Sequence, residues 1–219
     1  MSATSTLVSA RHFDYIRAHT APEDPFLLRL KEEALAAGIP PIWIAHEQAR
    51  LMQVLLCAAG AREVVEVGTL AGYSAITMAR ALPPGGRVRT IELDPKHADF
   101  SARQAARSDV ADRIEVHRGR GAEVLASFAD RSADAAFLDA DKASYAVYLK
   151  ECLRIVRPGG LVLVDNAFAF GQLFEADATD GEVAAVRAFN DHAASAPGYD
   201  GVICPVGDGL WIGTVRAPQ

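Results

Sequence analysis

The chain has 219 residues, half of them hydrophobic, and a formal net charge of −6. A chain of this length can bury roughly 70% of its unfolded surface in one core, so we expect a single domain over residues 1–219. The negative charge gives no general attraction to nucleic acid, and the sequence contains no run near the ~20 apolar residues of a membrane span.

The first 21 residues lack a basic segment followed by an apolar one, which is the pattern of a secretory signal. The three cysteines, Cys57, Cys152 and Cys204, are too scattered for a disulfide framework or a Cys-x-x-Cys metal site. We therefore expect a cytoplasmic protein whose cysteines are core thiols.

Residues 1–60 have helical patterns and are predicted to form a cap over a core made by residues 61–219. One helix should end near His19, a second should span residues 25–37, and a third should span residues 47–59. The second helix carries an apolar face suited to packing within the chain or across a dimer. That face consists of Leu27, Leu28, Leu30 and Leu35. Between the second and third helices, residues 39–45 contain two prolines and Trp43, which predicts a loop beside the ligand site.

Residues 64–74 combine a run of β-branched residues, two glycines and the start of a helical pattern. This predicts a strand, a tight loop at Gly68 and a helix whose N-terminus and free backbone N–H groups face a ligand. Glu66 lies two residues before Gly68, where a carboxylate repels a phosphate and attracts a cationic amine. The loop therefore disfavours a dinucleotide and favours a ligand that carries an amine.

The rest of the chain alternates strands with helices, which predicts an α/β fold with a doubly wound parallel sheet. The strand over residues 87–93 contains Glu92, whose spacing from Gly68 suits an acid that accepts the hydroxyl groups of a ribose; alternatively, it is a solvated carboxylate at a strand end. The last two strands are separated only by Gly207-Asp208-Gly209 and should form an antiparallel hairpin. The other predicted strands span residues 113–117, 133–138, 161–164, 200–206 and 210–215, and the helices span residues 95–107, 119–128 and 145–156.

Polar residues follow the fourth and fifth predicted strands. Asp139, Asp141 and Lys142 come after the fourth, and Asp165 and Asn166 come after the fifth. These groups should converge beside the glycine loop, because ligand sites in open α/β sheets lie at the carboxyl ends of the strands. The oxygens of Asp139, Asp165 and Asn166 suit Mg²⁺ or Ca²⁺. Alternatively, an acid such as Asp141 simply caps the helix that follows.

The chain carries four motifs in order: Glu66-Val-Gly68 with Gly72-Tyr73-Ser74, Asp139-Ala-Asp141-Lys142 followed by Tyr145, Asp165-Asn166, and Pro205-Val-Gly207-Asp208-Gly209. Their order and spacing resemble those of the cation-dependent class I O-methyltransferases that use S-adenosylmethionine. This family includes the caffeoyl-coenzyme A and catechol O-methyltransferases and their small bacterial relatives. The resemblance covers about residues 25–215. It implies a Rossmann-like, mostly parallel seven-stranded sheet and a homodimer.

The resemblance also implies roles for individual residues. The metal ligands would be Asp139, Asp165 and Asn166, holding Mg²⁺, Ca²⁺ or Mn²⁺, and the catalytic residues would be Lys142 and Asp139. Contacts to S-adenosylmethionine would come from Ile44, Glu66, Gly68, Ser74, Glu92, Gly121 and Asp139. The chain departs from many relatives at residues 45–50, and at residues 167–171 it lacks the tryptophan of plant relatives. The acceptor pocket should therefore differ from the plant one.

The expected reaction moves a methyl group from a sulfonium to a hydroxyl of a small aromatic acceptor with vicinal hydroxyls, of the catechol or hydroxycinnamoyl type. A phenol with a pKa of ~10 is a poor nucleophile at neutral pH, and coordination to a divalent ion stabilises its anion. Lys142 can accept the proton or hold the anion.

Three alternatives remain open at this point. A related branch of the family methylates a hydroxylated uridine in tRNA, but the arginines between residues 103 and 120 are expected to form a solvated face. A non-catalytic cofactor-binding protein is opposed by the intact set of Asp139, Lys142, Asp165 and Asn166. A nicotinamide dehydrogenase is opposed by Glu66 and by the missing third glycine of its fingerprint.

Overall fold

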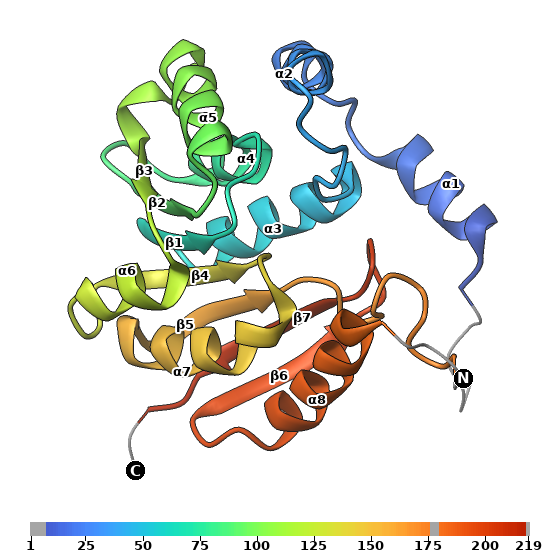
Figure 1. Cartoon of the computed structure of the whole chain (residues 1–219), viewed down its shortest axis with the longest axis vertical. Helices are drawn as coiled ribbons and strands as arrows, with labels where there is room; N and C mark the ends of the chain where they lie inside the picture. Colours follow the sequence, from blue (N-terminus) through green and yellow to red (C-terminus); the bar gives the residue numbers. More distant parts are fainter. Residues whose placement is uncertain (1–7, 176–179, 218–219) are drawn as a thin grey trace.

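The computed structural model describes residues 8–175 and 180–217. The described residues form a sheet of seven strands in the order β3-β2-β1-β4-β5-β7-β6, with helices on both faces (Figure 1). The strands are β1 (Glu63–Val67), β2 (Arg87–Glu92), β3 (Ile114–Arg118), β4 (Ala133–Leu138), β5 (Val156–Val164), β6 (Tyr199–Cys204) and β7 (Leu210–Val215).

The first five strands pair in parallel, and β7 runs antiparallel to both β5 and β6. The predicted mostly parallel, doubly wound sheet with a C-terminal antiparallel hairpin is therefore confirmed. Central strands such as β1 and β4 consist almost entirely of buried residues, because helices cover both of their faces.

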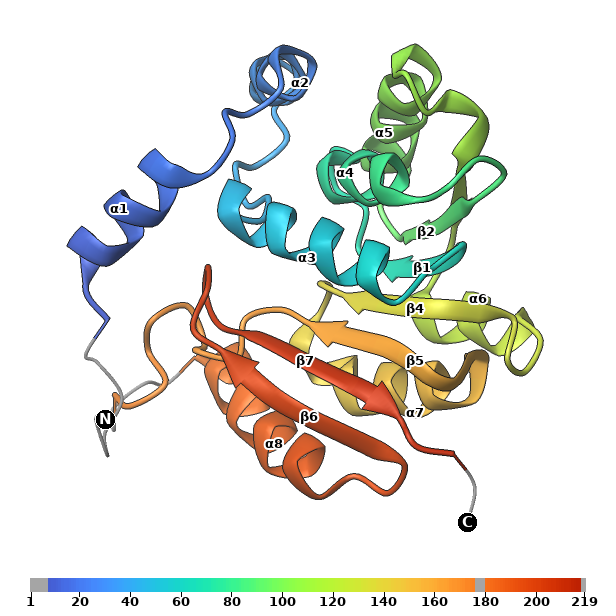
Figure 2. The ribbon, with the colours of Figure 1, turned by 180° about the vertical axis from the view of Figure 1, so that it is seen from behind.

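The helices divide into two layers and a pair that lies beyond them. α3, α4 and α5 pack on one face of the sheet, whereas α6, α7 and α8 pack on the other (Figure 2). α2 packs beside α4, and α1 projects from the body with no buried residue along its described length. The helices are α1 (Ala10–His19), α2 (Pro25–Ala36), α3 (His46–Ala58), α4 (Tyr73–Ala81), α5 (Pro95–Arg107), α6 (Gly121–Ser127), α7 (Tyr145–Ile155) and α8 (Gly181–Ser195), with single turns η1 (Ala111–Arg113) and η2 (Lys142–Ser144).

Two elements differ from the sequence-based expectations. β5 begins at Val156 rather than at Leu161, because the Pro158-Gly-Gly160 segment forms an irregularity inside the strand, opposite Ala133 and Ala135 of β4. α8 was not predicted. Its signal is nevertheless present, since Asp180 caps the helix and its buried residues recur at helical spacing.

The cysteine and leucine expectations are only partly correct. Cys152 is buried, but Cys57 is exposed and Cys204 is partly exposed, so the expectation of three core thiols is wrong. On α2, Leu27 and Leu30 are buried, whereas Leu28 and Leu35 lie on the exposed side of the helix. Within residues 8–175 and 180–217, no helix has the length and apolar character needed to cross a membrane.

The ends of β1 and β4 approach each other closely at Gly68. This residue has a φ of 99°, and a Cβ atom added to it would lie 1.8 Å from the carbonyl oxygen of Asp139. Only glycine combines this conformation with so close an approach. The glycine loop after β1 is thereby held directly against the acidic segment after β4.

We expect Gly68→Ala to lower the free energy of unfolding by about 2 kcal/mol or more, because it adds a steric clash to the cost of a left-handed backbone. Gly198→Ala is the matched control, since Gly198 has a φ of 83° but no atom within 4 Å of an added Cβ. That control should lose only about 1 kcal/mol. Urea denaturation measures both values, and equal losses would contradict the role given to the contact with Asp139.

Candidate active site

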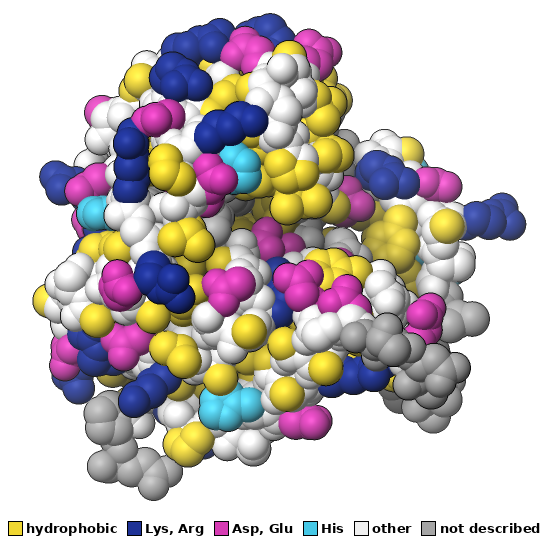
Figure 3. Space-filling model, in the orientation of Figure 1, with side chains coloured by type: hydrophobic (Ala, Val, Ile, Leu, Met, Phe, Trp, Pro, Cys, Tyr) yellow, Lys and Arg dark blue, Asp and Glu magenta, His cyan; other side chains and the backbone are white. Residues whose placement is uncertain are grey.

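A cavity of about 850 Å³ opens at the carboxyl ends of β1, β2, β4 and β5. Figure 3 shows a hollow on this face of the molecule, with hydrophobic and acidic side chains around it. Its walls come from the loop before α3, the glycine loop after β1, the start of α6, and the segments after β4 and β5. The sheet topology thus collects residues that are far apart in the sequence.

The glycine loop is fastened by Glu92 at the end of β2. One carboxylate oxygen of Glu92 accepts backbone hydrogen bonds from Thr69 at 3.1 Å and Leu70 at 2.8 Å, and the other accepts one from Asp94 at 2.9 Å. Gly72 then takes a φ of 86° and begins α4, whose positive N-terminal end includes Ser74. Glu92 and Ser74 both line the cavity.

Most of the predicted cofactor residues lie around this one cavity. The residues that line it are Ile44, Gly68, Ser74, Glu92, Gly121 and Asp139. Gly121 has no room for a side chain, because an added Cβ atom would lie 2.8 Å from Val67 and 2.9 Å from the Tyr148 ring. The backbone at the start of α6 therefore forms part of the wall.

Glu66 lies behind the wall rather than in it. Its side chain is fully buried, and Oε2 accepts a hydrogen bond of 2.5 Å from the Thr90 hydroxyl. No group in the described part of the chain bonds Oε1. Burial raises the pKa of Glu66 to about 8. The carboxyl is thus a buried acid with one oxygen still available.

The three predicted metal ligands also line the cavity, and each is held by a neighbouring side chain. Asp139 Oδ1 accepts from Lys142 Nζ at 3.2 Å, and Asp165 Oδ1 accepts from Gln48 Nε2 at 2.9 Å. Asn166 Nδ2 donates to Asp208 Oδ2 at 3.1 Å. These contacts use one terminal atom of each ligand side chain, and the other terminal atom is an oxygen in all three.

The chemistry of this donor set fits a divalent cation. Burial, followed by the nearby Asp139 carboxylate, raises the pKa of Asp165 to about 7. A cation relieves that repulsion, and carboxylate and amide oxygens suit Mg²⁺, Mn²⁺ or Ca²⁺. Among residues 8–175 and 180–217, no three His, Cys, Asp or Glu side chains are grouped to hold an ion. An ion at this site would therefore need the Asn166 amide as a third protein ligand.

Lys142 is the buried cation of the site. It lies in η2 with only 6% of its surface exposed, and Nζ donates to Tyr145 Oη at 2.7 Å as well as to Asp139. Nζ also lies 5.7 Å from the centre of the Phe170 ring. Burial and the nearby carboxylates of Asp139 and Asp165 raise the pKa of Tyr145 well above its ordinary value. Tyr145 therefore offers Lys142 a neutral hydroxyl, while Asp139 supplies the opposite charge.

Two residues of the site were not predicted. Gln48 is 1% exposed, and its side-chain oxygen packs so closely on Gly207 that an added Cβ atom there would lie 1.9 Å away. Asp208 lies in the hairpin motif, which had been given no role. The suggestion that Asp141 is a helix cap is wrong, because its side chain makes no capping bond and instead accepts from Tyr148 Oη at 2.6 Å.

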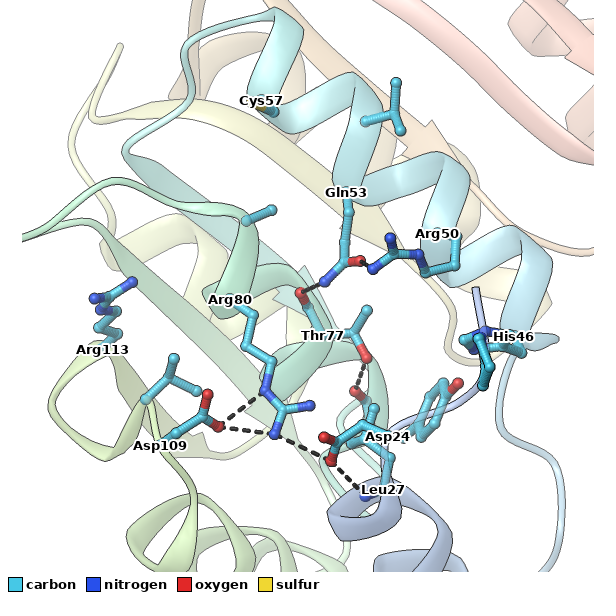
Figure 4. A pocket seen from close by; sticks show the side chains of 15 residues that line it. Asp24, Leu27, His46, Arg50, Gln53, Cys57, Thr77, Arg80, Asp109 and Arg113 are labelled. Carbon is cyan, nitrogen blue, oxygen red and sulfur yellow. Dashed lines mark hydrogen bonds and ion pairs between the residues drawn. The ribbon is translucent and has the colours of Figure 1, made fainter. Parts of the chain in front are cut away.

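A second cavity, of about 790 Å³, lies between α2, α3 and α4 (Figure 4). In it, Arg80 joins Asp24 at 3.3 Å and Asp109 at 2.8 Å. Among the described residues that line this cavity, none is a predicted site residue. Tyr73 lines both cavities.

Comparisons with known proteins agree with this arrangement. A sequence profile described as O-methyltransferase matches residues 17–215. The chain belongs to the O-methyltransferase family. The catechol O-methyltransferase of Niastella koreensis is 36% identical over 179 residues, which is 80% of this chain and 81% of the relative. That of Mycobacterium tuberculosis is 35% identical over 196 residues, which is 89% of each chain.

A solved structure extends the agreement to three dimensions. The crystal structure of the O-methyltransferase from Bacillus cereus in complex with SAH superposes with a TM-score of 0.84 at 30% identity, covering 93% of this chain and 96% of that one. The resemblance inferred from the motifs is therefore confirmed at the level of the family. The activity of this O-methyltransferase is the transfer of a methyl group to an oxygen atom.

The buried carboxyl of Glu66 should make the stability of the cofactor-free enzyme depend on pH. Its folded pKa of about 8 exceeds its ordinary value of 4.5, so between these values the folded state binds more protons than the unfolded state. The free energy of unfolding should therefore fall as pH rises from about 5 to about 8. In Glu66→Gln that loss should be smaller, because an amide does not ionise.

Urea denaturation at several pH values measures this difference. Glu123→Gln is the control, because Glu123 is largely exposed and should leave the profile of the wild type unchanged. Parallel profiles for the wild type and Glu66→Gln would contradict the burial argument.

Proposed function

We propose that this enzyme transfers the methyl group of S-adenosylmethionine to one hydroxyl of a small aromatic acceptor with vicinal hydroxyls, with the help of a divalent ion. The observation that carries the proposal is the meeting of Lys142, Asp139, Asp165 and Asn166 in one cavity that the glycine loop also lines. The names of the two catechol O-methyltransferase relatives support the acceptor class.

The cofactor would occupy the part of the cavity beside β1 and β2. The hydroxyl groups of its ribose would donate hydrogen bonds to Glu92, which lines the cavity at the end of β2. The buried Glu66 carboxyl, with its available oxygen, would stabilise the amine end from behind the wall. The complex of the Bacillus cereus relative with SAH supports this use of the site.

The divalent ion would be held by Asp139, Asp165 and Asn166 and, when bound, would lower the pKa of a coordinated acceptor hydroxyl. The chain's own residues would do the rest. Lys142 Nζ, which is paired with Asp139, would accept the hydroxyl proton or hold the resulting anion. Transfer from a sulfonium to an oxyanion removes charge from both partners, so the cavity walls mainly provide in-line placement.

The contacts of the arginines between residues 103 and 120 weaken the tRNA alternative. Arg107 is paired with Glu33 at 2.7 Å, and Arg118 is paired with Asp99. Arg113 donates to the carbonyl oxygen of Leu82 at 3.0 Å. The charges of Arg107 and Arg118 are thus compensated by acids of the chain itself, and Arg113 is directed to a backbone carbonyl, which reduces the positive charge open to phosphates.

The remaining alternatives are also less favoured. A non-catalytic binding protein would have no need for a buried lysine beside two acids, since burying such charges is costly unless they are used or compensated. A nicotinamide dehydrogenase would need a phosphate-binding loop without a nearby acid, whereas Glu66 lies directly behind this one.

The wider organisation stays part of the proposal. We infer a cytoplasmic homodimer in which residues 1–219 form one methyltransferase domain, with residues 1–60 as the cap. The projecting α1 and the exposed Leu28, Leu35 and Val54 on the outer sides of α2 and α3 support a dimer surface there. Light scattering on the purified chain tests the dimer.

Activity should require a divalent ion, because the oxygens of Asp139, Asp165 and Asn166 suit such an ion and Lys142, the buried cation of the site, hydrogen-bonds only Asp139 among them. With labelled S-adenosylmethionine and caffeate, excess EDTA should abolish turnover and Mg²⁺ or Mn²⁺ should restore it. The same assay with hydroxylated tRNA as the acceptor tests the alternative function. For caffeate, kcat/KM should change less than ~3-fold between about 50 and 200 mM salt, whereas a phosphate-binding substrate loses affinity steeply.

Full turnover of caffeate in a rigorously metal-free preparation would remove the metal from the proposal. Methylation of tRNA that is suppressed by salt, with catechols inert, would transfer the enzyme to the RNA-modifying branch.

Lys142→Ala should lower kcat by roughly 100-fold or more, because it removes the group that accepts the proton or holds the anion. The affinity for S-adenosylmethionine, measured by calorimetry, should stay near that of the wild type. Lys150→Ala is the control, since Lys150 is an exposed lysine of the neighbouring α7. A Lys142→Ala enzyme with normal kcat would show that the lysine is structural.

A further inference from the structure

The segment that follows β5 has an unusual backbone. Asn166, Ala169 and Phe170 have φ values of 63°, 52° and 58°, although none of them is glycine. A left-handed backbone is strained for residues other than glycine, although least so for asparagine, so the surroundings must hold the segment in place. We call residues 166–171 the acceptor loop, because Asn166 and Phe170 both line the cavity.

One carboxylate binds this loop at three points. Asp208 Oδ2 accepts from the backbone N–H of Phe170 at 2.7 Å and from Asn166 Nδ2 at 3.1 Å. Asp208 Oδ1 accepts from the backbone N–H of Gly171 at 3.1 Å. The carbonyl oxygens of Asp208 and Gly209 accept from Phe168 and Ala167, both at 2.9 Å. The turn between β6 and β7 thus lies against the segment after β5 (Figure 2).

These bonds act on two groups of the site at once. Asn166 Nδ2 donates a hydrogen bond to Asp208 Oδ2. The side-chain oxygen of Asn166 is therefore the atom left free to bind an ion. The bond to the Phe170 N–H sets the position of a ring that lines the cavity and lies 5.7 Å from Lys142 Nζ. Asp208 is therefore connected to one proposed metal ligand and to one wall of the acceptor site.

The same turn is anchored from the opposite side. Gly207 packs on the side-chain oxygen of Gln48. The side-chain nitrogen of Gln48 donates a hydrogen bond to Asp165 Oδ1 at 2.9 Å. Asp165 and Asn166 are adjacent in the chain, so the turn is in contact with the groups that orient both. A loose turn would disturb the donor set even with every ligand still present.

We propose that Asp208 is a positioning residue that presents the Asn166 oxygen to the divalent ion and holds Phe170 against the acceptor. This inference rests on the proposed metal-dependent function and assigns to it a residue outside the ligand set. A hydrogen-bonded neighbour of a metal ligand typically accounts for 10-fold to 100-fold in metal affinity or activity.

The test is a direct titration of the purified enzyme with Mn²⁺ by calorimetry, in the presence of saturating S-adenosylhomocysteine. Asp208→Ala should weaken Mn²⁺ binding by about 10-fold to 100-fold. Asp208→Asn should lie between it and the wild type, because one amide oxygen can keep the bonds made by Oδ2 while the bond to Gly171 is lost. At saturating Mn²⁺, the KM for caffeate should rise with kcat changed less than ~3-fold.

Asp200→Ala is the matched control. Asp200 lies on the same hairpin and is paired with Arg216 on its exposed side. This variant removes an acid and a contact from the hairpin but should leave Mn²⁺ affinity and the KM for caffeate unchanged. The affinity for S-adenosylhomocysteine, measured separately, identifies any variant that has failed to fold.

The outcomes separate the two proposals. If the wild type itself does not bind Mn²⁺, both the metal-dependent function and the positioning role of Asp208 are wrong. If the wild type binds Mn²⁺ and both Asp208 variants bind it equally well with an unchanged KM, the positioning role alone is overturned. A loss in Asp200→Ala as large as that in Asp208→Ala would also overturn it, because the effect would then belong to the hairpin as a whole.

Discussion

The structure depends on the close approach of Gly68 to the carbonyl oxygen of Asp139. Because β1 and β4 are neighbours in a parallel sheet, their carboxyl ends point the same way, and a residue without a side chain lets the segments after them touch. The glycine loop and the acidic segment therefore share one cavity wall. In the proposed function this adjacency would place the methyl donor beside the acceptor, as in-line transfer requires.

Charge is the second constraint on this site. Lys142 and Asp165 are buried and Asp139 is partly buried beside them, and buried charged groups are costly unless each has a partner. Lys142 pairs with Asp139, whereas Asp165 and the neighbouring Asn166 amide are held by residues from other parts of the fold. Gln48 comes from α3 and Asp208 from the hairpin, so the helical layer and the C-terminal hairpin both contribute to the electrostatics of the centre. The fold is thereby connected to the site at more points than the ligands alone suggest.

The sequence predicted the parts of the site that depend on local pattern and sheet topology. Gly68, Glu92, Asp139 and Asp165 each follow or end a strand with a strong apolar signal, and parallel strands bring such ends together without further information. The partners of these residues are different. The Gln48 amide meets Asp165 across 117 positions of sequence, and no periodicity or spacing encodes such a contact. The positions of Gln48 and Asp208 follow only from how α3 packs on the sheet and how the turn between β6 and β7 meets the segment after β5.

The acceptor loop suggests how one centre can serve different acceptors. The residues proposed to bind the cofactor and the ion lie mostly at or just after the carboxyl ends of β1, β2, β4 and β5, whose positions are fixed by the central sheet. Phe170, by contrast, stands on a loop whose left-handed residues are held by a turn at the edge of the fold. Changes in residues 167–171 can therefore reshape the acceptor wall while the central sheet and its strand ends stay as they are. Because the motifs lie mainly at the strand ends and the acceptor wall lies on a separate loop, the motifs identify the reaction more readily than the molecule that is methylated.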